Sequence, residues 1–222
     1  MKAVFTSCLL AATFVAAGTA HAAPVALTNA GFEAGWTSLG ASGSDGNVTF
    51  NYRPAGPDVG WSFSGNAGVA AGYSLLTAYE GSRFGLLQLG NSSAPFGAQG
   101  TYMTQSFTLD SNAVVDLGFA LALRPAYQYG QRVAVALDGQ IIDTFGAEST
   151  SWTLQSRSLG MLAAGTHTLG FAGTADYAVW GDTTAYIDAV QLNAAPVPEP
   201  ETYALMLAGL GLVGFATRRR IV

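Results

Sequence analysis

Three short segments of this 222-residue chain mix aromatic and polar side chains in a pattern that suits contact with a saccharide. They read "PDVGWSF", "LRPAYQYGQR" and "ADYAVWGDT", and all three fall in predicted loops. An aromatic ring stacks on the apolar face of a sugar while neighbouring polar groups bond its hydroxyls. The alternative is that such aromatic residues fill the core or the edges of a β-sandwich. The candidate ligand-binding residues are Trp61, Arg124, Tyr127, Tyr129, Asp176, Tyr177 and Trp180.

Residue types that serve catalysis are scarce in this sequence. The only cysteine, Cys8, lies in an apolar run at the start of the chain, and His167 falls in an alternating strand, which favours a structural role. No G-x-S-x-G elbow and no histidine-rich metal motif is present. A glycosidase needs two facing carboxylates, and the sequence alone does not pair any two. We therefore predict that the protein has no catalytic residues and is not an enzyme.

One carboxylate stands at an awkward place in the last predicted strand, "TAYIDAVQL". Strict alternation puts Asp188 on the same face as Tyr186, Val190 and Leu192. If that face is the core, Asp188 is buried and needs a cation or strong hydrogen-bond donors. The alternative is that the opposite face packs inward and that Asp188 is solvated.

The elements that must position these residues are short strands. In "VVDLGFALAL" one face holds Val115, Leu117, Phe119, Leu121 and Leu123, and similar alternation recurs in "YMTQSFTLD", "QRVAVALDGQII" and "GTHTLGFAG". The Asp138-Gly139 pair predicts a tight hairpin. Clusters rich in Gly, Ser and Pro separate the runs. This pattern predicts an all-β sandwich or barrel in which the first and last strands pair.

The central part of the chain is acidic. Residues 24–193 hold five arginines, no lysine and twelve carboxylates. Such a balance argues against nucleic acid and against anionic membrane surfaces as partners.

The start of the chain has the organisation of a secretory signal peptide. Lys2 precedes an apolar stretch, and Ala20-His21-Ala22 supplies small residues at a cleavage site. We expect residues 1–22 to be removed on export, which would leave a mature protein without cysteine.

The end of the chain resembles the PEP-CTERM sorting signal of bacteria with an outer membrane. The resemblance rests on the Pro198-Glu199-Pro200 motif, an apolar run over 203–216 and the basic residues Arg218, Arg219 and Arg220. It implies that the tail enters the inner membrane transiently and is cut by an exosortase, after which the body reaches the surface or the extracellular matrix. The fourteen apolar residues extend about 21 Å as a helix, against about 30 Å of hydrocarbon, which suits a temporary hold. "AAPVP" before the motif predicts a stiff spacer.

The body resembles galactose-binding-like jelly rolls, a group that includes many carbohydrate-binding modules. "LTNAGFEAGW", "GLLQLG", "GTYMTQSFTL" and "AYIDAVQL" carry this resemblance over about 26–193. It implies a jelly-roll β-sandwich and a structural Ca²⁺ held by Glu33, Asp188 and backbone carbonyls. Oxygen ligands of this kind suit calcium. Ala189 stands where many relatives have a second acid.

The complete expectation is a jelly-roll body (24–193) between a signal peptide (1–22) and a sorting tail with a short apolar helix (194–222). The leading hypothesis for its function is an exported, non-catalytic protein that binds or organises exopolysaccharide. The rivals are an adhesive matrix protein without a sugar site and a glycan-active hydrolase. An ice-binding protein ranks low because no regular threonine array is visible in the sequence.

Overall fold

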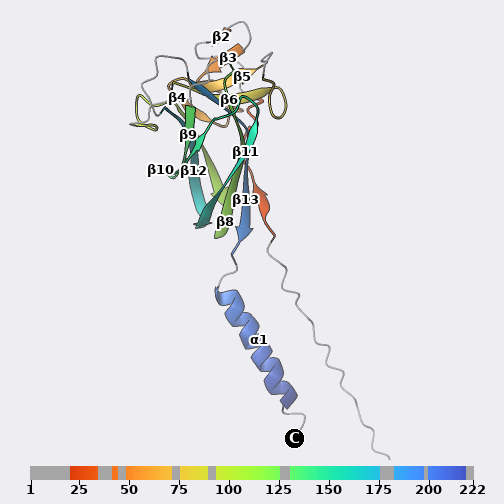
Figure 1. Cartoon of the computed structure of the whole chain (residues 1–222). Helices are drawn as coiled ribbons and strands as arrows, with labels where there is room; N and C mark the ends of the chain where they lie inside the picture. Colours follow the sequence, from red (N-terminus) through yellow and green to blue (C-terminus); the bar gives the residue numbers. More distant parts are fainter. Residues whose placement is uncertain are drawn as a thin grey trace, which may run out of the picture.

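The chain folds into two antiparallel sheets packed face to face, followed by one helix (Figure 1). The structure is a computed structural model, and it describes residues 21–34, 42–44, 49–71, 76–89, 94–125, 131–175, 183–197 and 200–218. The eight strands of the larger sheet are β1 (Ala23–Val25), β2 (Ser42–Ser44), β3 (Thr49–Tyr52), β5 (Ala67–Ala71), β6 (Arg83–Gln88), β8 (Ala113–Leu123), β11 (Thr153–Leu162) and β13 (Thr184–Pro196). The five strands of the smaller sheet are β4 (Ser62–Ser64), β7 (Tyr102–Leu109), β9 (Gln131–Leu137), β10 (Gln140–Gly146) and β12 (Gly165–Ala175). The helix α1 spans Pro200–Arg218.

This architecture confirms the predicted jelly-roll β-sandwich with a short C-terminal helix. The alternating face of β8 points into the core, where its five predicted residues are at most 3% exposed. The Asp138-Gly139 pair forms the predicted turn between β9 and β10, with φ angles of 50° and 80° that suit a tight hairpin. The first strand pairs with the last, as expected, with Ala23 opposite Ala194.

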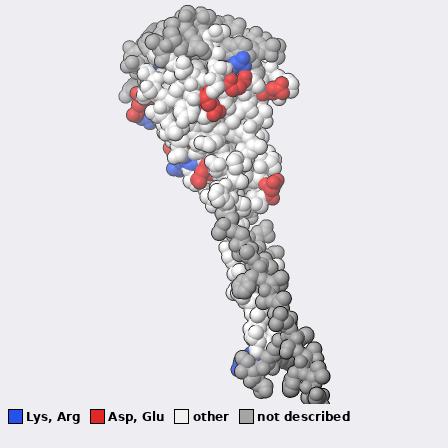
Figure 2. All heavy atoms as spheres, turned by 90° about the vertical axis from the view of Figure 1, so that its right-hand side faces the viewer, with Lys and Arg blue, Asp and Glu red and all other residues white. Residues whose placement is uncertain are grey.

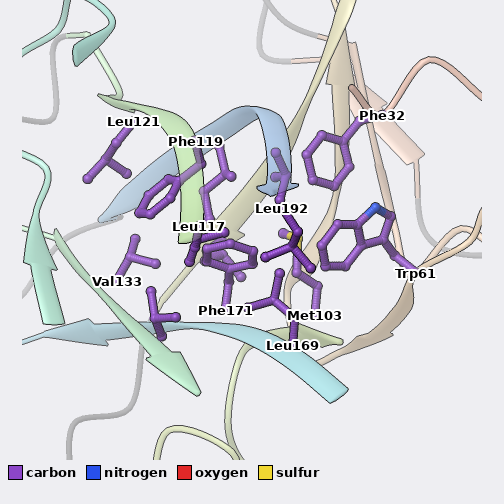
Figure 3. Packing of buried hydrophobic residues seen from close by; sticks show 14 of the residues in the cluster. Phe32, Trp61, Met103, Leu117, Phe119, Leu121, Val133, Leu169, Phe171 and Leu192 are labelled. Atoms are coloured by element: carbon purple, nitrogen blue, oxygen red, sulfur yellow. The ribbon is translucent and has the colours of Figure 1, made fainter. Parts of the chain in front are cut away.

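A chain of aromatic rings joins the two sheets (Figure 3). Phe32 stacks on Trp61 with a centroid separation of 5.3 Å, and Trp61 meets Phe171 at 6.0 Å. Phe171 in turn contacts Phe119 of the opposite sheet at 5.1 Å. Trp61 is only 4% exposed, and its indole N–H donates to the carbonyl of Asn29 (3.1 Å). The prediction that Trp61 binds a ligand is therefore wrong, because the core covers both faces of its ring.

The predicted spacer before the sorting motif is part of the sandwich. Ala194 and Ala195 pair with β8, Pro196 lies opposite Ala113, and the Val197 amide donates to the Asn112 carbonyl (3.0 Å). "AAPVP" is therefore not a free linker, because sheet hydrogen bonds hold it as far as Val197. The expected jelly-roll boundary at residue 193 falls inside β13.

The sorting tail and the start of β13 lie at opposite ends of the sandwich. Strand β13 begins at Thr184 and ends at Pro196, from which α1 follows at the lower end of the body in Figure 1. Strand β8 runs antiparallel beside it, and its eleven residues span about 35 Å. Within the described part of the chain, no helix combines the length and apolar character needed to cross a membrane.

Gly85→Ala tests how tightly the two sheets pack. A Cβ atom at Gly85 would lie 2.8 Å from the ring of Phe32 in the core, so we expect a loss of about 1–3 kcal/mol in the free energy of unfolding. At Gly118 the Cβ would meet only the side chain of Gln191, at 3.1 Å, which is exposed and free to move aside. Chemical denaturation should show Gly118→Ala within about 0.5 kcal/mol of wild type. Equal effects of the two substitutions would contradict this account of the core.

Candidate functional site

Residues 90–93, 126–130 and 176–182 lie outside the described residues, and the residues that flank them lie at the end of the sandwich opposite the tail. The residues that flank them are neighbours: the Leu89 amide donates to the Thr183 carbonyl (2.8 Å), and the Arg124 amide donates to Thr184 (3.1 Å). In the smaller sheet, Gln131 lies opposite Ala175. We call this end of the sandwich the loop end.

Five of the predicted ligand-binding residues belong to these segments and so lie outside the described part. They are Tyr127, Tyr129, Asp176, Tyr177 and Trp180. The fold brings the described residues that flank these two segments to one end of the molecule, although almost fifty residues separate the segments in the sequence. Arg124 is described, and it is 7% exposed, so it lies beneath the surface at the end of β8.

Buried polar groups lie under the loop end. Gln131 is fully buried, and its side-chain N–H donates across the sandwich to the Leu87 carbonyl (3.3 Å). Its Oε1 atom, and the buried hydroxyl of Thr174, have no hydrogen-bond partner in the part of the chain that the structure describes. The interior of a β-sandwich normally holds apolar side chains, and polar side chains lie mostly at its surface. Sequence reasoning missed Gln131, although strand alternation puts it on the same face as Val133 and Val135 and so gave a signal that it points inward.

The awkward Asp188 is fully buried, but not on the face that strict alternation predicted. A β-bulge interrupts β13 between Asp188 and Gln191, and Ala189 takes a positive φ of 49°. Asp188 therefore lies with Tyr186 on the outer face of the larger sheet, while Val190 and Leu192 point into the core between the sheets. The extra residue changes the side of the sheet on which the strand continues.

Asp188 and Glu33, the two predicted metal ligands, hold the same loop. One Asp188 oxygen accepts the amides of Tyr79 (2.8 Å) and Glu80 (3.1 Å). Glu33 accepts the amides of Ser82 and Arg83, both at 2.8 Å, and the Ser82 hydroxyl. The Arg83 guanidinium also donates to the Glu33 carbonyl. We call residues 79–83, bound at both ends by a carboxylate, the clasped loop.

The two carboxylates differ in their electrostatics. Burial raises the pKa of Asp188 to about 7, although three backbone amides oppose the shift, and the charge of Glu80 adds to it. The pKa of Glu33 is lowered: desolvation acts against the shift, but the bonds from Ser82 and Arg83 outweigh it. Asp188 is therefore a buried acid whose negative charge its surroundings do not fully compensate.

Glu80 is the acidic residue that sequence reasoning missed. A Cβ atom placed on Gly31 would collide with Glu80 Oε1, so this carboxyl group lies against the turn that precedes Glu33. Its position in a loop gave no sign of this contact. Within the described residues, no group of three or more His, Cys, Asp or Glu side chains is arranged to hold a metal ion. A cation here would therefore need backbone carbonyls beside the acids.

The contacts of His167 fit a structural role, in which its ring links two parts of the chain. Its Nδ1 lies 2.8 Å from an Asp138 oxygen and its Nε2 lies 2.9 Å from the Ala163 carbonyl. Both partners are acceptors, so both ring nitrogens donate when the ring is charged. These bonds raise the pKa of His167, with the Asp138 bond the largest cause, while desolvation opposes the shift. A general base needs a free nitrogen lone pair, and here both nitrogens are engaged.

Comparison with known families identifies the tail. Residues 196–220 match the PEP-CTERM protein-sorting motif, as predicted. This motif marks an exported protein that is sorted to the cell envelope. Of its predicted residues, Pro200 begins α1 and Arg218 ends it, while Pro198, Glu199, Arg219 and Arg220 lie outside the described part. A search of curated protein sequences found no relative of the chain.

Several solved structures resemble the body in fold. A Stig cyclase from Fischerella sp. TAU is 15% identical, with 80% of this chain and 100% of that chain covered and a TM-score of 0.46. A family 61 carbohydrate-binding module in complex with β-1,4-galactotriose is 19% identical over 76% and 97% of the two chains, with a TM-score of 0.44. A xylan-binding domain from Paenibacillus barcinonensis is 12% identical over 73% and 99%, with a TM-score of 0.41. Likeness at this level carries no ligand or activity over to this chain.

The raised pKa of Asp188 predicts a dependence of stability on pH when a chelator is present. Asp188 binds its proton more tightly in the folded state, so its own contribution to stability is fully present below about pH 4 and is lost as the pH rises towards about 7. The loss is on the order of a few kcal/mol, since one pKa unit corresponds to about 1.4 kcal/mol. Denaturant titrations of wild type and Asp188→Asn from pH 4 to 8 measure the difference. A pH profile that Asp188→Asn leaves unchanged would rule out Asp188 as its source.

Proposed function

We propose that this chain is an exported, non-catalytic protein that binds or organises polysaccharide at the cell surface or in the extracellular matrix. The observation that carries the proposal is the placement of the loop end and the sorting tail at opposite ends of β13. While the tail is held at the membrane, the described residues that flank the candidate segments lie at the end of the sandwich away from it. A protein built in this way presents its loop end to the material outside the inner membrane.

In this proposal the first partners of the chain, the inner membrane and an exosortase, both act on its tail. Its apolar helix inserts transiently in the inner membrane of a Gram-negative bacterium, and an exosortase cuts near Pro198-Glu199-Pro200. Since β13 is paired up to Pro196 and Val197 is hydrogen-bonded to Asn112, a protease reaches the motif without opening the sandwich only beyond Val197. The folded body then moves to the cell surface or the exopolysaccharide matrix.

The loop end has the chemistry of a saccharide site. Two of its segments supply four tyrosines or tryptophans close to polar residues in the sequence, namely Tyr127, Tyr129, Tyr177 and Trp180, and the sheet ends that flank these segments hold buried polar side chains. Stacking on aromatic rings and hydrogen bonding from a few fixed polar groups are the two parts of sugar recognition. An adhesive matrix protein without a sugar site would not need these residues together.

Binding to insoluble glycans separates the proposal from its rivals. We expect Tyr127→Ala and Trp180→Ala each to weaken retention by about tenfold, because each removes a stacking surface. Tyr79→Ala is the matched control, since Tyr79 is an exposed aromatic outside the three segments and its backbone contact to Asp188 persists. Equal retention of all variants would exclude a site at the loop end, and release of reducing sugar would indicate the hydrolase.

We further propose that Ca²⁺ binds at the clasped loop, with Glu33 and Asp188 as its acidic ligands. Two features support this proposal: Asp188 is buried with incomplete compensation, and Glu80 adds negative charge nearby. All the side-chain donors are oxygens, which suits a hard cation. The bound ion would neutralise Asp188 and hold the clasped loop against the last strand.

A calcium-dependent melting temperature tests this second proposal. At pH 8, where Asp188 is ionised, millimolar Ca²⁺ should raise the melting temperature by several degrees above that in a chelator, since a ligand at 100 times its Kd adds about 2.7 kcal/mol. Glu33→Gln and Asp188→Asn should each reduce this rise, and the same concentration of Mg²⁺ is the ionic control. An identical melting temperature with Ca²⁺ and with chelator would contradict this proposal and leave the backbone amides and the Ser82 hydroxyl as partners of these carboxylates.

A further inference from the structure

The outer face of the smaller sheet carries a two-column array of hydroxyl groups. Strands β7 and β12 pair so that Thr108 lies opposite Thr166 and Ser106 lies opposite Thr168. The hydroxyl oxygens of each pair are 3.4 Å apart. Ser62 of the next strand, β4, lies opposite Thr104 of β7 and extends the array by one more strand. We call these six residues the hydroxyl face.

The hydroxyl face is open to solvent. Ser62, Ser106, Thr108 and Thr166 are exposed, and Thr104 and Thr168 are half-buried. Outward side chains on one strand repeat about every 6.8 Å, and neighbouring strands lie about 4.8 Å apart, so the hydroxyls form a regular grid. A hydroxyl has one donor and two acceptor sites. Each pair uses one donor internally and keeps one O–H and several lone pairs for a partner.

An aromatic pair borders the hydroxyl face. The ring of Phe96 lies over Gly170, where a Cβ atom would come within 2.7 Å of the ring and 3.3 Å of the methyl group of Thr104. Tyr102 contacts the same ring with a centroid separation of 5.5 Å. Both aromatic residues are half-buried, so part of each ring stays accessible. Because Gly170 has no side chain, the Phe96 ring has room to pack beside the hydroxyl groups.

The outward positions of β4, β7 and β12 carry no charge. They are Ser62, Ser64, Tyr102, Thr104, Ser106, Thr108, Thr166, Thr168, Gly170, Ala172 and Thr174. Asp138 borders this surface, but its carboxylate accepts the Thr168 amide (2.8 Å) and pairs with His167 (2.8 Å). Figure 2 shows, on the side of the molecule that it presents, that charged side chains form small separate groups on a largely uncharged surface.

From this geometry we infer a second binding surface, on which a neutral polysaccharide chain lies along β7 and β12. The sugar hydroxyls bond the paired Ser and Thr side chains, and a pyranose ring packs on Phe96 and Tyr102. An uncharged, hydroxyl-rich partner fits because the face offers both donors and acceptors but no charge to balance an acidic glycan. The surface is distinct from the loop end, since its residues lie along the sheet and not in the three segments.

The direct test removes the hydroxyls and keeps the shape of the face. The variant combines Ser106→Ala, Thr108→Val, Thr166→Val and Thr168→Val, and affinity is measured against cellulose, xylan and galactan as neutral probes and alginate as an acidic one. We expect neutral-glycan affinity to fall by about tenfold or more, because several hydrogen bonds are lost together. The matched control is Ser156→Ala with Ser158→Ala, which removes exposed hydroxyls from β11 on the other sheet. Phe96→Ala tests the aromatic part separately.

The melting temperature of the combined variant must stay unchanged while its affinity for neutral glycans falls. If the combined variant is unstable, Thr166→Val alone is tested instead. Wild-type affinity of the hydroxyl variant for every neutral probe would overturn the inference. If Tyr127→Ala and Trp180→Ala then still abolish retention, the loop-end proposal stands without the hydroxyl face. A wild-type protein that binds no glycan, or only alginate, would also overturn the inference. So would a protein that shapes ice crystals without retaining on glycans, since the face would then order water.

Discussion

The hydrogen bonding of β13 to three other strands is the constraint on which the rest of this structure depends. It pairs with β8 and β6 and, near its end, with β1, so it has strand neighbours on both sides at residues 185–187 and 192–194. It begins beside the loop end and ends at the sorting motif. Because one strand runs from beside the loop end to Pro196, the sheet sets the separation between the residues that flank the candidate segments and the start of the tail.

The bulge in β13 separates two halves of the strand whose side chains pack on opposite faces of the larger sheet. Before it, Tyr186 and Asp188 face outward and meet the loop that covers this side of the sheet. After it, Val190 and Leu192 close the core between the sheets. A strand without the bulge would place either the acid in the core or the two aliphatic residues outside it. The positive φ of Ala189 is the local cost of using both faces in one strand.

In this acidic body, which has no lysine, backbone amides serve as the hydrogen-bond donors to several carboxylates. Asp188, Glu33 and Asp138 each accept amide hydrogens from a segment distant in the sequence. A carboxylate bound in this way fixes a loop without a long cationic side chain, whose ordering would cost conformational entropy. The arrangement leaves the outward positions of β4, β7 and β12 uncharged. It also leaves Asp188 as the group with the least compensated charge.

The local patterns of the sequence determined the strands of the core, the Asp138-Gly139 hairpin and the sorting tail, because alternation, turn preference and a contiguous motif are all short-range. They also singled out Asp188, but left open whether it is buried or solvated. Tertiary structure alone decided that Trp61 belongs to the core and that Glu33 and Asp188 clasp one loop. It also formed the hydroxyl face from Thr108 and Thr166, which the sequence separates by 58 positions. No single strand contains that array, since strand pairing across the sheet creates it, and this is why the sequence shows no regular threonine pattern.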